Sequence, residues 1–196
     1  IFFVISGDRT EAQSTAEKIA ARVKDILKNI FEYEVKFGYV GVTSDRKTLK
    51  EYVTLAKKTA KYCFCTGKWM NIYAENQNKM QFVDCITKYN MFGDLLDSIG
   101  MQELVKFDDS IFPHSFSVKD VENVIDLYRN YLFSVRNIYV KYGLDYENIT
   151  ESFYYFYDSK QLTEMIKSRI TDLNVQLRDG SNIIEVVKNY IKNNYS

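Results

Sequence analysis

Histidine and proline are almost absent from this chain of 196 residues, which has one of each. The histidine, His114, directly follows the proline, Pro113. General acid–base catalysis by histidine requires a partner group and a pocket, and no serine or cysteine arrangement accompanies His114. We therefore interpret His114 as a loop residue, and this scarcity argues against histidine-based catalysis.

Cysteine is also scarce: the chain has three, Cys63, Cys65 and Cys85. An odd and small number without a signal peptide is typical of the reducing cytosol. The segment Cys63-Phe64-Cys65 is not a CxxC motif. We interpret the cysteines as small buried hydrophobic residues rather than a metal or redox pair.

Long apolar runs and an excess of one charge are both missing. No run approaches the roughly 20 residues of a membrane span, and no basic segment precedes an apolar core as in a signal peptide. We therefore expect a cytoplasmic protein that does not bind a membrane. The 26 basic residues balance the 26 acidic ones, which argues against a broad nucleic-acid-binding surface.

Apolar residues are plentiful, at 46% of the chain with 15% aromatic, so a packed core is expected. The first 73 residues alternate between strand and helix patterns. In chain order these predict a strand at Ile1–Ser6, a helix at 10–31 capped by Asp8, a strand at 33–42, a helix from Ser44 or Asp45 to Gly67, and a strand at Trp69–Tyr73. Gly38 and Gly41 in the middle strand indicate that another segment approaches its backbone closely.

Strand patterns end after Tyr73. The remaining patterns predict a helix at 80–98, an irregular segment at 100–116, a long helix from Ser117 to Gly143, a short aromatic helix at 149–157, a helix capped by Asp158, a break at Arg178–Ser181, and a last helix at 181–196. The expected fold class is α+β, with a β-α-β-α-β part followed by an all-α part.

No residue stands out as catalytic, cofactor-binding or metal-binding. Asp108 and Asp109 lack further converging oxygen ligands, and we interpret them as solvated turn acids. The glycines form neither a GxGxxG motif nor a P-loop. The 16 tyrosines and 13 phenylalanines could line a ligand cavity or stack bases, but without a basic groove we interpret them as core and interface packing.

The order of motifs in residues 1–73 resembles the second half of a diguanylate-cyclase-like (GGDEF-type) domain. The strand VKFGYVGV (35–42) is similar to that family's VSIGIA strand, and YVTLAKKTAKYCFCTGKWMN (52–71) is similar to its last helix and following turn. Catalytic members carry a phosphate-contacting lysine three residues before the glycine, where this chain has Phe64. The resemblance thus implies a cyclase-like scaffold that is not an enzyme.

Residues 134–180 resemble the helical linker of YesN-like two-component response regulators. That linker carries a GID turn, here Gly143-Leu144-Asp145, and a helix start of the form TLEEL, here Gln161–Glu164. The segment SNIIEVVKNYIKNNYS (181–196) is similar to the first helix of the AraC-type helix-turn-helix domain. These matches divide the chain into a partial GGDEF-like domain (1–75), a helical linker domain (76–180) and the first helix of an AraC-type domain (181–196).

The resemblance implies a central regulatory and dimerisation segment of a cytosolic response regulator. Because the chain opens at Ile1 in a strand pattern, we expect it to be a piece of a longer protein. Such a segment would relay the signal of a receiver domain to a DNA-binding domain outside this chain. We expect a homodimer that reaches DNA only through that domain and needs no cofactor. The alternative is a small-molecule-sensing module with an aromatic pocket in the helical half or near Trp69.

Overall fold

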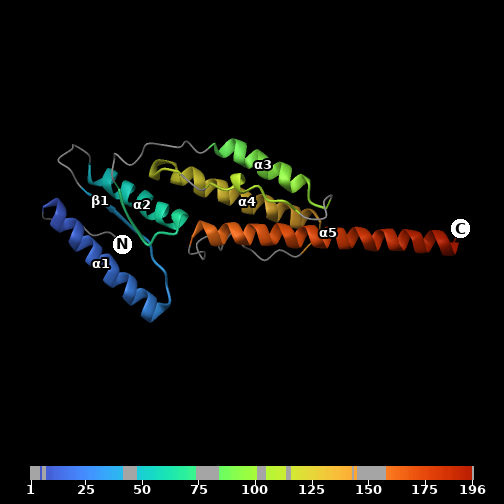
Figure 1. The fold of residues 1–196 in the computed structure, drawn as a ribbon, viewed down its shortest axis with the longest axis horizontal. Helices are drawn as coiled ribbons and strands as arrows, with labels where there is room; N and C mark the ends of the chain where they lie inside the picture. Colours follow the sequence, from blue (N-terminus) through green and yellow to red (C-terminus); the bar gives the residue numbers. More distant parts are fainter. Residues whose placement is uncertain are drawn as a thin grey trace. The chain divides into compact units, whose positions relative to one another are not determined.

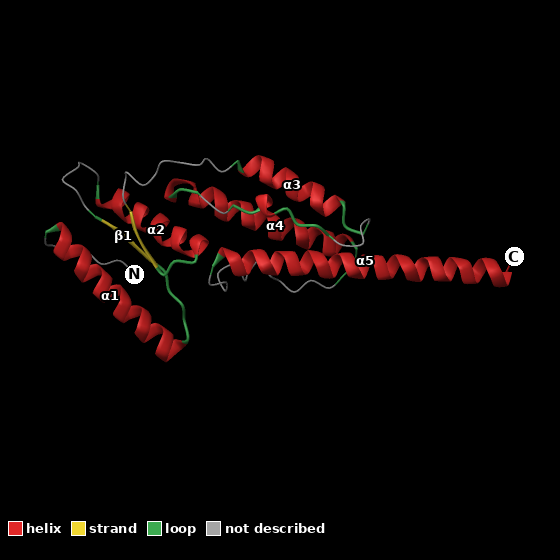
Figure 2. Ribbon diagram, in the orientation of Figure 1, coloured by secondary structure: helices red, strands yellow, loops and turns green. Residues whose placement is uncertain are grey.

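The chain is mostly helical, with a small two-stranded parallel sheet (Figures 1 and 2). A computed structural model describes residues 5, 8–41, 48–73, 84–100, 105–113, 116–142, 144 and 158–195, and from 181 on it describes only the backbone, except at Ile191. The elements are α1 (Arg9–Phe31), β1 (Phe37–Val40), α2 (Leu49–Thr66), β2 (Met70–Tyr73), α3 (Cys85–Asp97), the 3-10 turns η2 (Asp109–Ile111) and η3 (Val118–Asp120), α4 (Val121–Lys141) and α5 (Ser159–Tyr195). The predicted α+β fold class is confirmed, because the chain combines a parallel sheet with many helices.

The chain divides into two compact units, neither of which is continuous in sequence. The first unit contains Ile1–Val83, Pro113–Asp126 and Tyr154–Gln161, and the second contains Asp84–Phe112, Leu127–Phe153 and Leu162–Ser196. Helices α4 and α5 therefore begin with residues of the first unit and continue with residues of the second. The division of the chain at residues 75 and 180 stays a prediction.

Helix α1 begins as the sequence predicts. The side chain of Asp8 accepts a hydrogen bond from the Glu11 amide at 2.9 Å, which satisfies one free N–H group of the first turn. Burial along α1 is concentrated at Ala12, Ala16 and Ala20. Ile26 and Ile30, in the second half of α1, are 45% and 66% exposed, because apolar periodicity shows which residues share a helix face but not how far the neighbouring elements extend along it.

The sheet consists of β1 and β2, which pair in parallel with Phe37 opposite Met70 and Val40 opposite Tyr73. The strand predicted at 33–42 is confirmed for Phe37–Val40, and the strand predicted at Trp69–Tyr73 for Met70–Tyr73. In the view of Figure 2 both strands lie between α1 and α2. The strand predicted at Ile1–Ser6 lies outside the described residues except for Ile5, which is not in a strand.

Helix α2 connects the two strands and begins later than predicted. Its N-cap is Thr48, which forms a reciprocal capping box with Glu51, whereas the sequence indicated Ser44 or Asp45. The Thr48 amide donates to Glu51 Oε2 at 2.5 Å, and the Glu51 amide donates to Thr48 Oγ1 at 3.4 Å. This pair satisfies two N–H groups, so the helix begins there. Gly67 ends α2 in the left-handed region with φ 70°, as predicted.

The core of the second unit is built from α3, α4 and α5. Its fully buried side chains include Phe92, Phe112, Tyr131, Leu132, Val135, Tyr139, Leu162, Ile166, Ile170 and Leu173. Phe92 stacks on Tyr131 with ring centroids 4.1 Å apart, and the Tyr131 hydroxyl donates to the Ile111 carbonyl at 2.9 Å. These aromatic residues are therefore confirmed as core packing. Tyr131 has the arrangement usual for a buried tyrosine, with its ring in apolar contact and its hydroxyl hydrogen-bonded.

Helix α5 runs without interruption over 37 residues, so the predicted break at Arg178–Ser181 is wrong. The Asp158 side chain caps it and accepts from the Gln161 amide at 2.9 Å, as predicted. A glycine inside a helix costs only about 1 kcal/mol relative to alanine, less than the loss of the hydrogen bonds around a break. Gly180 is therefore tolerated inside α5. The helix predicted at 149–157 lies outside the described residues.

Two other helix predictions are confirmed in their described parts. The helix predicted at 80–98 corresponds to α3, and the long helix predicted after Ser117 corresponds to η3 followed by α4. The Ser117 hydroxyl donates to Asp120 Oδ2 at 2.7 Å and accepts from the Lys119 amide at 3.2 Å. None of the helices in the described ranges combines the length and apolarity that crossing a membrane requires.

Candidate functional site

The two adjacent acids, Asp108 and Asp109, serve separate structural purposes. Asp108 caps η2 by accepting from the Ser110 amide at 2.8 Å, and this backbone hydrogen bond lowers the pKa of Asp108. Asp109 pairs with Lys167 at 2.6 Å. Within the described ranges, no cluster of histidine, cysteine or acidic side chains could hold a metal ion. His114 lies outside those ranges.

Cys63 and Cys65 are both buried near the end of α2, as predicted. The Cys63 thiol donates to the Phe37 carbonyl of β1 at 3.2 Å. Burial raises the pKa of both thiols from 9.0 to about 12. Both thiols therefore stay protonated at neutral pH, and the reactive thiolate form is scarce.

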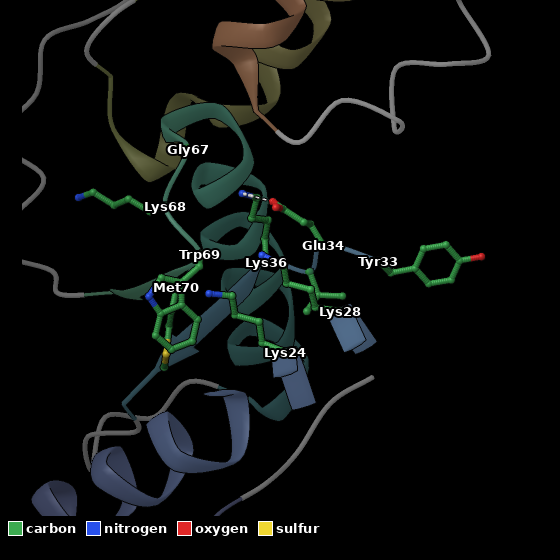
Figure 3. A pocket seen from close by; sticks show the side chains of 10 residues that line it. Lys24, Lys28, Tyr33, Glu34, Lys36, Gly67, Lys68, Trp69 and Met70 are labelled. Atoms are coloured by element: carbon green, nitrogen blue, oxygen red, sulfur yellow. Dashed lines mark ion pairs between the residues drawn. The ribbon is translucent and has the colours of Figure 1, made fainter. Parts of the chain in front are cut away.

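A hollow of about 440 Å³ lies in the first unit beside Trp69, the single tryptophan of the chain. Its walls are the C-terminal half of α1, the segment that precedes β1, and the segment from the end of α2 into β2 (Figure 3). The described lining residues are Lys24, Lys28, Tyr33, Glu34, Val35, Lys36, Gly67, Lys68, Trp69 and Met70. This volume falls within the range of roughly 300–1,000 Å³ that is usual for small-molecule sites.

The hollow is positively charged, because four lysines and one glutamate line it. Lys36 Nζ lies 3.9 Å from Glu34 Oε2, and the Glu34 side chain is 41% exposed. Because the pair is partly in contact with solvent, it contributes little to stability. Among the residues that the structure describes, Lys24, Lys28 and Lys68 have no carboxylate within ion-pair distance. The lysines therefore present positive charge that the described protein groups do not neutralise.

Trp69 is held in a defined orientation at the edge of this hollow. Its ring meets Phe37 edge-on with centroids 6.4 Å apart, and Lys24 Nζ lies 5.1 Å from its centroid. Figure 3 shows Lys24 directed toward the indole, whereas Tyr33 and Lys68 point outward in opposite directions. With 39% of its surface exposed, Trp69 presents a planar apolar wall beside the lysine cluster.

A second and more open hollow of about 800 Å³ lies along α1 and β2. It shares Lys68, Trp69 and Met70 with the first, but its other described charged residues are Glu17 and Lys18. Because these two charges cancel, it lacks the concentrated positive charge of the first hollow.

Sequence reasoning located this site only in part. It proposed the neighbourhood of Trp69 for a pocket, but it did not include Lys24 and Lys28 of α1 in that pocket. Their spacing of four residues places both on one side of the helix, which was the available signal. Phe64, at the position of the cyclase family's lysine, is not among the described lining residues, so the hollow differs from the site that the resemblance would imply.

The ends of α2 and the starts of α4 and α5 meet in the first unit. Lys61 Nζ of α2 lies 2.8 Å from Glu122 Oε2 of α4. The rings of Tyr62 and Phe116 meet edge-on with their centroids 5.4 Å apart. The Ser159 hydroxyl, in the first turn of α5, donates to the Cys65 carbonyl of α2. The last turns of α2 therefore hold the beginnings of both long helices, directly before Gly67 at the hollow.

Comparison of the chain with protein-family models, with curated proteins and with solved structures finds no match.

Proposed function

We propose that the chain is a non-catalytic regulatory segment of a transcription regulator, which relays a conformational signal along α5 to a DNA-binding domain. The observation that carries this proposal is the contact between Ser159 and the Cys65 carbonyl at the start of an uninterrupted helix. A displacement at the end of α2 would move the first turn of α5. A continuous helix of 37 residues transmits that displacement over about 55 Å, at 1.5 Å per residue.

The resemblances of residues 35–71, 134–180 and 181–196 support the more specific proposal of a YesN-like response regulator. In that proposal β1, α2 and β2 belong to a degenerate GGDEF-like half-domain, because strand, helix, Gly67 and strand follow in the family's order. The parent protein would carry a receiver domain before residue 1 and an AraC-type domain after residue 196. A parent gene that encodes neither would overturn this assignment.

The relay is tested in the parent regulator with two substitutions at Gly180. Gly180→Pro interrupts α5, because proline removes a helical hydrogen bond and clashes with the preceding turn, whereas Gly180→Ala preserves the helix. Transcripts that change when the gene is deleted should be restored by the wild type and by Gly180→Ala but not by Gly180→Pro. Full restoration by Gly180→Pro would refute a relay through α5.

Dimerisation and DNA binding are tested on the 196-residue chain itself. We propose a homodimer, so light scattering coupled to gel filtration should give twice the mass of one chain. We propose that DNA is bound only through the downstream domain, so the chain should show no sequence-selective DNA binding by fluorescence anisotropy. A monomer at all concentrations would refute the first proposal, and submicromolar selective binding would refute the second.

A second candidate function is small-molecule sensing, which the hollow beside Trp69 favours. The hollow ends at Gly67, and Asp158, the cap of α5, lies next to that glycine: a β-carbon on residue 67 would be 3.4 Å from Asp158 Oδ2. A ligand in the hollow would thus lie close to the start of α5. Ligand binding should raise the melting temperature by mass action and alter amide exchange in α5, whereas binding without any change in α5 would refute a sensing role.

A further inference from the structure

The lysine cluster beside Trp69 consists of Lys24, Lys28, Lys36 and Lys68, and among the described residues only Glu34 pairs with one of them, Lys36, at 3.9 Å. Lys28 lies in the last turn of α1, where the helix dipole favours a cation. The dipole does not account for Lys24, which lies one turn earlier, or for Lys36, which comes from the segment before β1. Bringing three ammonium groups to one hollow costs free energy through their repulsion, and an anion in the hollow would remove that cost.

The lining chemistry indicates what kind of anion fits. Ammonium groups bind phosphate as point charges and donate charge-assisted hydrogen bonds. Trp69 adds a planar wall that Phe37 and Lys24 hold in place, and aromatic side chains of this kind stack on planar rings. The hollow thus combines a charged region suited to phosphate with a flat apolar region suited to a ring.

The size of the hollow and the charge of the chain favour a small molecule over a nucleic-acid strand. A strand needs a basic groove that follows several phosphates. The neighbouring hollow along β2 contains Glu17 beside Lys18, and the 26 basic residues of the chain are balanced by 26 acidic ones. The four lysines instead line a hollow of about 440 Å³, a volume that is usual for a small-molecule site.

We propose that this hollow binds a small phosphorylated molecule with a planar ring, of the nucleotide class, with Lys24 and Lys28 at the phosphate and Trp69 at the ring. The proposal rests on the sensing candidate and names its class of ligand. Lys36 adds charge from the segment before β1, and its loose pairing with Glu34 allows it to turn toward the ligand.

The single tryptophan makes binding directly measurable. The full chain is titrated with ADP, with pyrophosphate and with adenosine, and tryptophan emission is excited where tyrosine does not absorb. ADP should change the emission of Trp69 most strongly, because it supplies both phosphate and ring. In calorimetry, pyrophosphate should bind more weakly than ADP, and adenosine should bind weakest because it lacks the charge.

Matched variants assign the contacts. Lys24→Gln and Lys28→Gln should each weaken ADP binding about tenfold, as expected for the loss of one charge-assisted hydrogen bond. Arg22→Gln removes the same charge from an exposed position of α1 that does not line the hollow, so it should change binding less than twofold. Trp69→Ala should weaken ADP binding and leave pyrophosphate binding unchanged in calorimetry.

Several results would overturn the proposal. One is the absence of any heat or emission change with all three compounds up to about 1 mM, the weakest binding of interest. Equal effects of Arg22→Gln and Lys24→Gln would show that only net charge matters. Much tighter binding of a single-stranded oligonucleotide would assign the hollow to a strand instead. ADP binding without altered exchange in α5 would support this inference while refuting the sensing function.

Discussion

Gly38 of β1 packs so closely against α2 that a β-carbon on residue 38 would lie 2.9 Å from Cβ of Thr59. The same atom would also lie 2.5 Å from the Ala60 amide nitrogen and would collide with the Ala56 carbonyl oxygen. The clash involves helix backbone, which cannot move aside as a flexible side chain can. Glycine at this position therefore determines how closely α2 covers the sheet.

Replacement of Gly38 by alanine should destabilise the first unit. We expect a loss of about 1–3 kcal/mol in the free energy of unfolding, the usual cost of overpacking a core, measured by urea denaturation with circular dichroism. Gly93→Ala is the control, because a β-carbon there meets nothing within 4 Å. Since Gly93 lies inside α3, that change should stabilise by about 0.5–1 kcal/mol. Equal effects of the two substitutions would contradict the close packing of β1 on α2.

Substitutions at Gly180 should show whether α5 is one helix in solution. Gly180→Pro should lower the helical circular-dichroism signal and destabilise by about 3 kcal/mol, the cost of proline inside a helix. Gly180→Ala should stabilise by about 1 kcal/mol. If the chain instead turned at Arg178–Ser181, proline would be tolerated and alanine would not stabilise, so the pair separates the two conformations.

Cys63 and Cys65 should resist alkylation in the folded protein. Their pKa of about 12 leaves about one thiol in ten thousand ionised at pH 8, and the thiolate is the reactive form. Cys85 is only half-buried and should be modified first. Mass spectrometry after treatment with iodoacetamide should find one modified cysteine, and three after unfolding in urea. Rapid modification of Cys63 or Cys65 without denaturant would contradict their burial.

Stability should depend on pH below about 4 through Asp84, the N-cap of α3. Its carboxylate accepts from the Thr87 amide at 3.0 Å and from the Thr87 hydroxyl at 2.7 Å, and the first of these bonds is the main cause of its lowered pKa. A pKa that is lower in the folded state adds stability above the unfolded value of about 3.9, and this stability is lost as pH falls through the folded pKa. Asp84→Asn should reduce this loss of stability at low pH, as measured by urea denaturation at several pH values. An identical pH dependence of the free energy of unfolding in the two proteins would contradict the role of Asp84.

Helix and strand positions were largely readable from local patterns. The caps at Asp8 and Asp158 were recognisable because a short acidic side chain satisfies amides of the next turn. The end of α2 at Gly67 was recognisable because a helix often ends in a left-handed residue, here with φ 70°, and glycine adopts that conformation without strain. The N-cap of α2 was missed because Ser44 and Asp45 are equally good capping residues, and only the reciprocal bonds of Thr48 and Glu51 distinguish the true start.

The site depended on contacts between segments distant in sequence. Lys24, Lys36 and Trp69 are separated along the chain and meet only because β1 and β2 pair in parallel beside α1. The close approach that the sequence predicts at Gly38 is confirmed, and the one that it predicts at Gly41 is wrong. A β-carbon on residue 41, which follows β1, would meet side-chain atoms of Arg9 and Tyr39 at 3.9 Å, an ordinary contact distance, whereas a β-carbon on residue 38 would meet the backbone of α2.

The amino-acid sequence by itself determined the alternation of helices and strands, the α+β class and the helix caps at Asp8 and Asp158, because these follow from periodicity and capping within a few residues. Only the tertiary structure decided that Trp69 lies beside lysines of α1, that Ser159 joins the end of α2, and that α5 continues through Gly180. The first two depend on packing between residues far apart in the chain, which local propensities of about 1 kcal/mol do not determine. The third depends on the helical hydrogen bonds that an unbroken α5 keeps around Gly180.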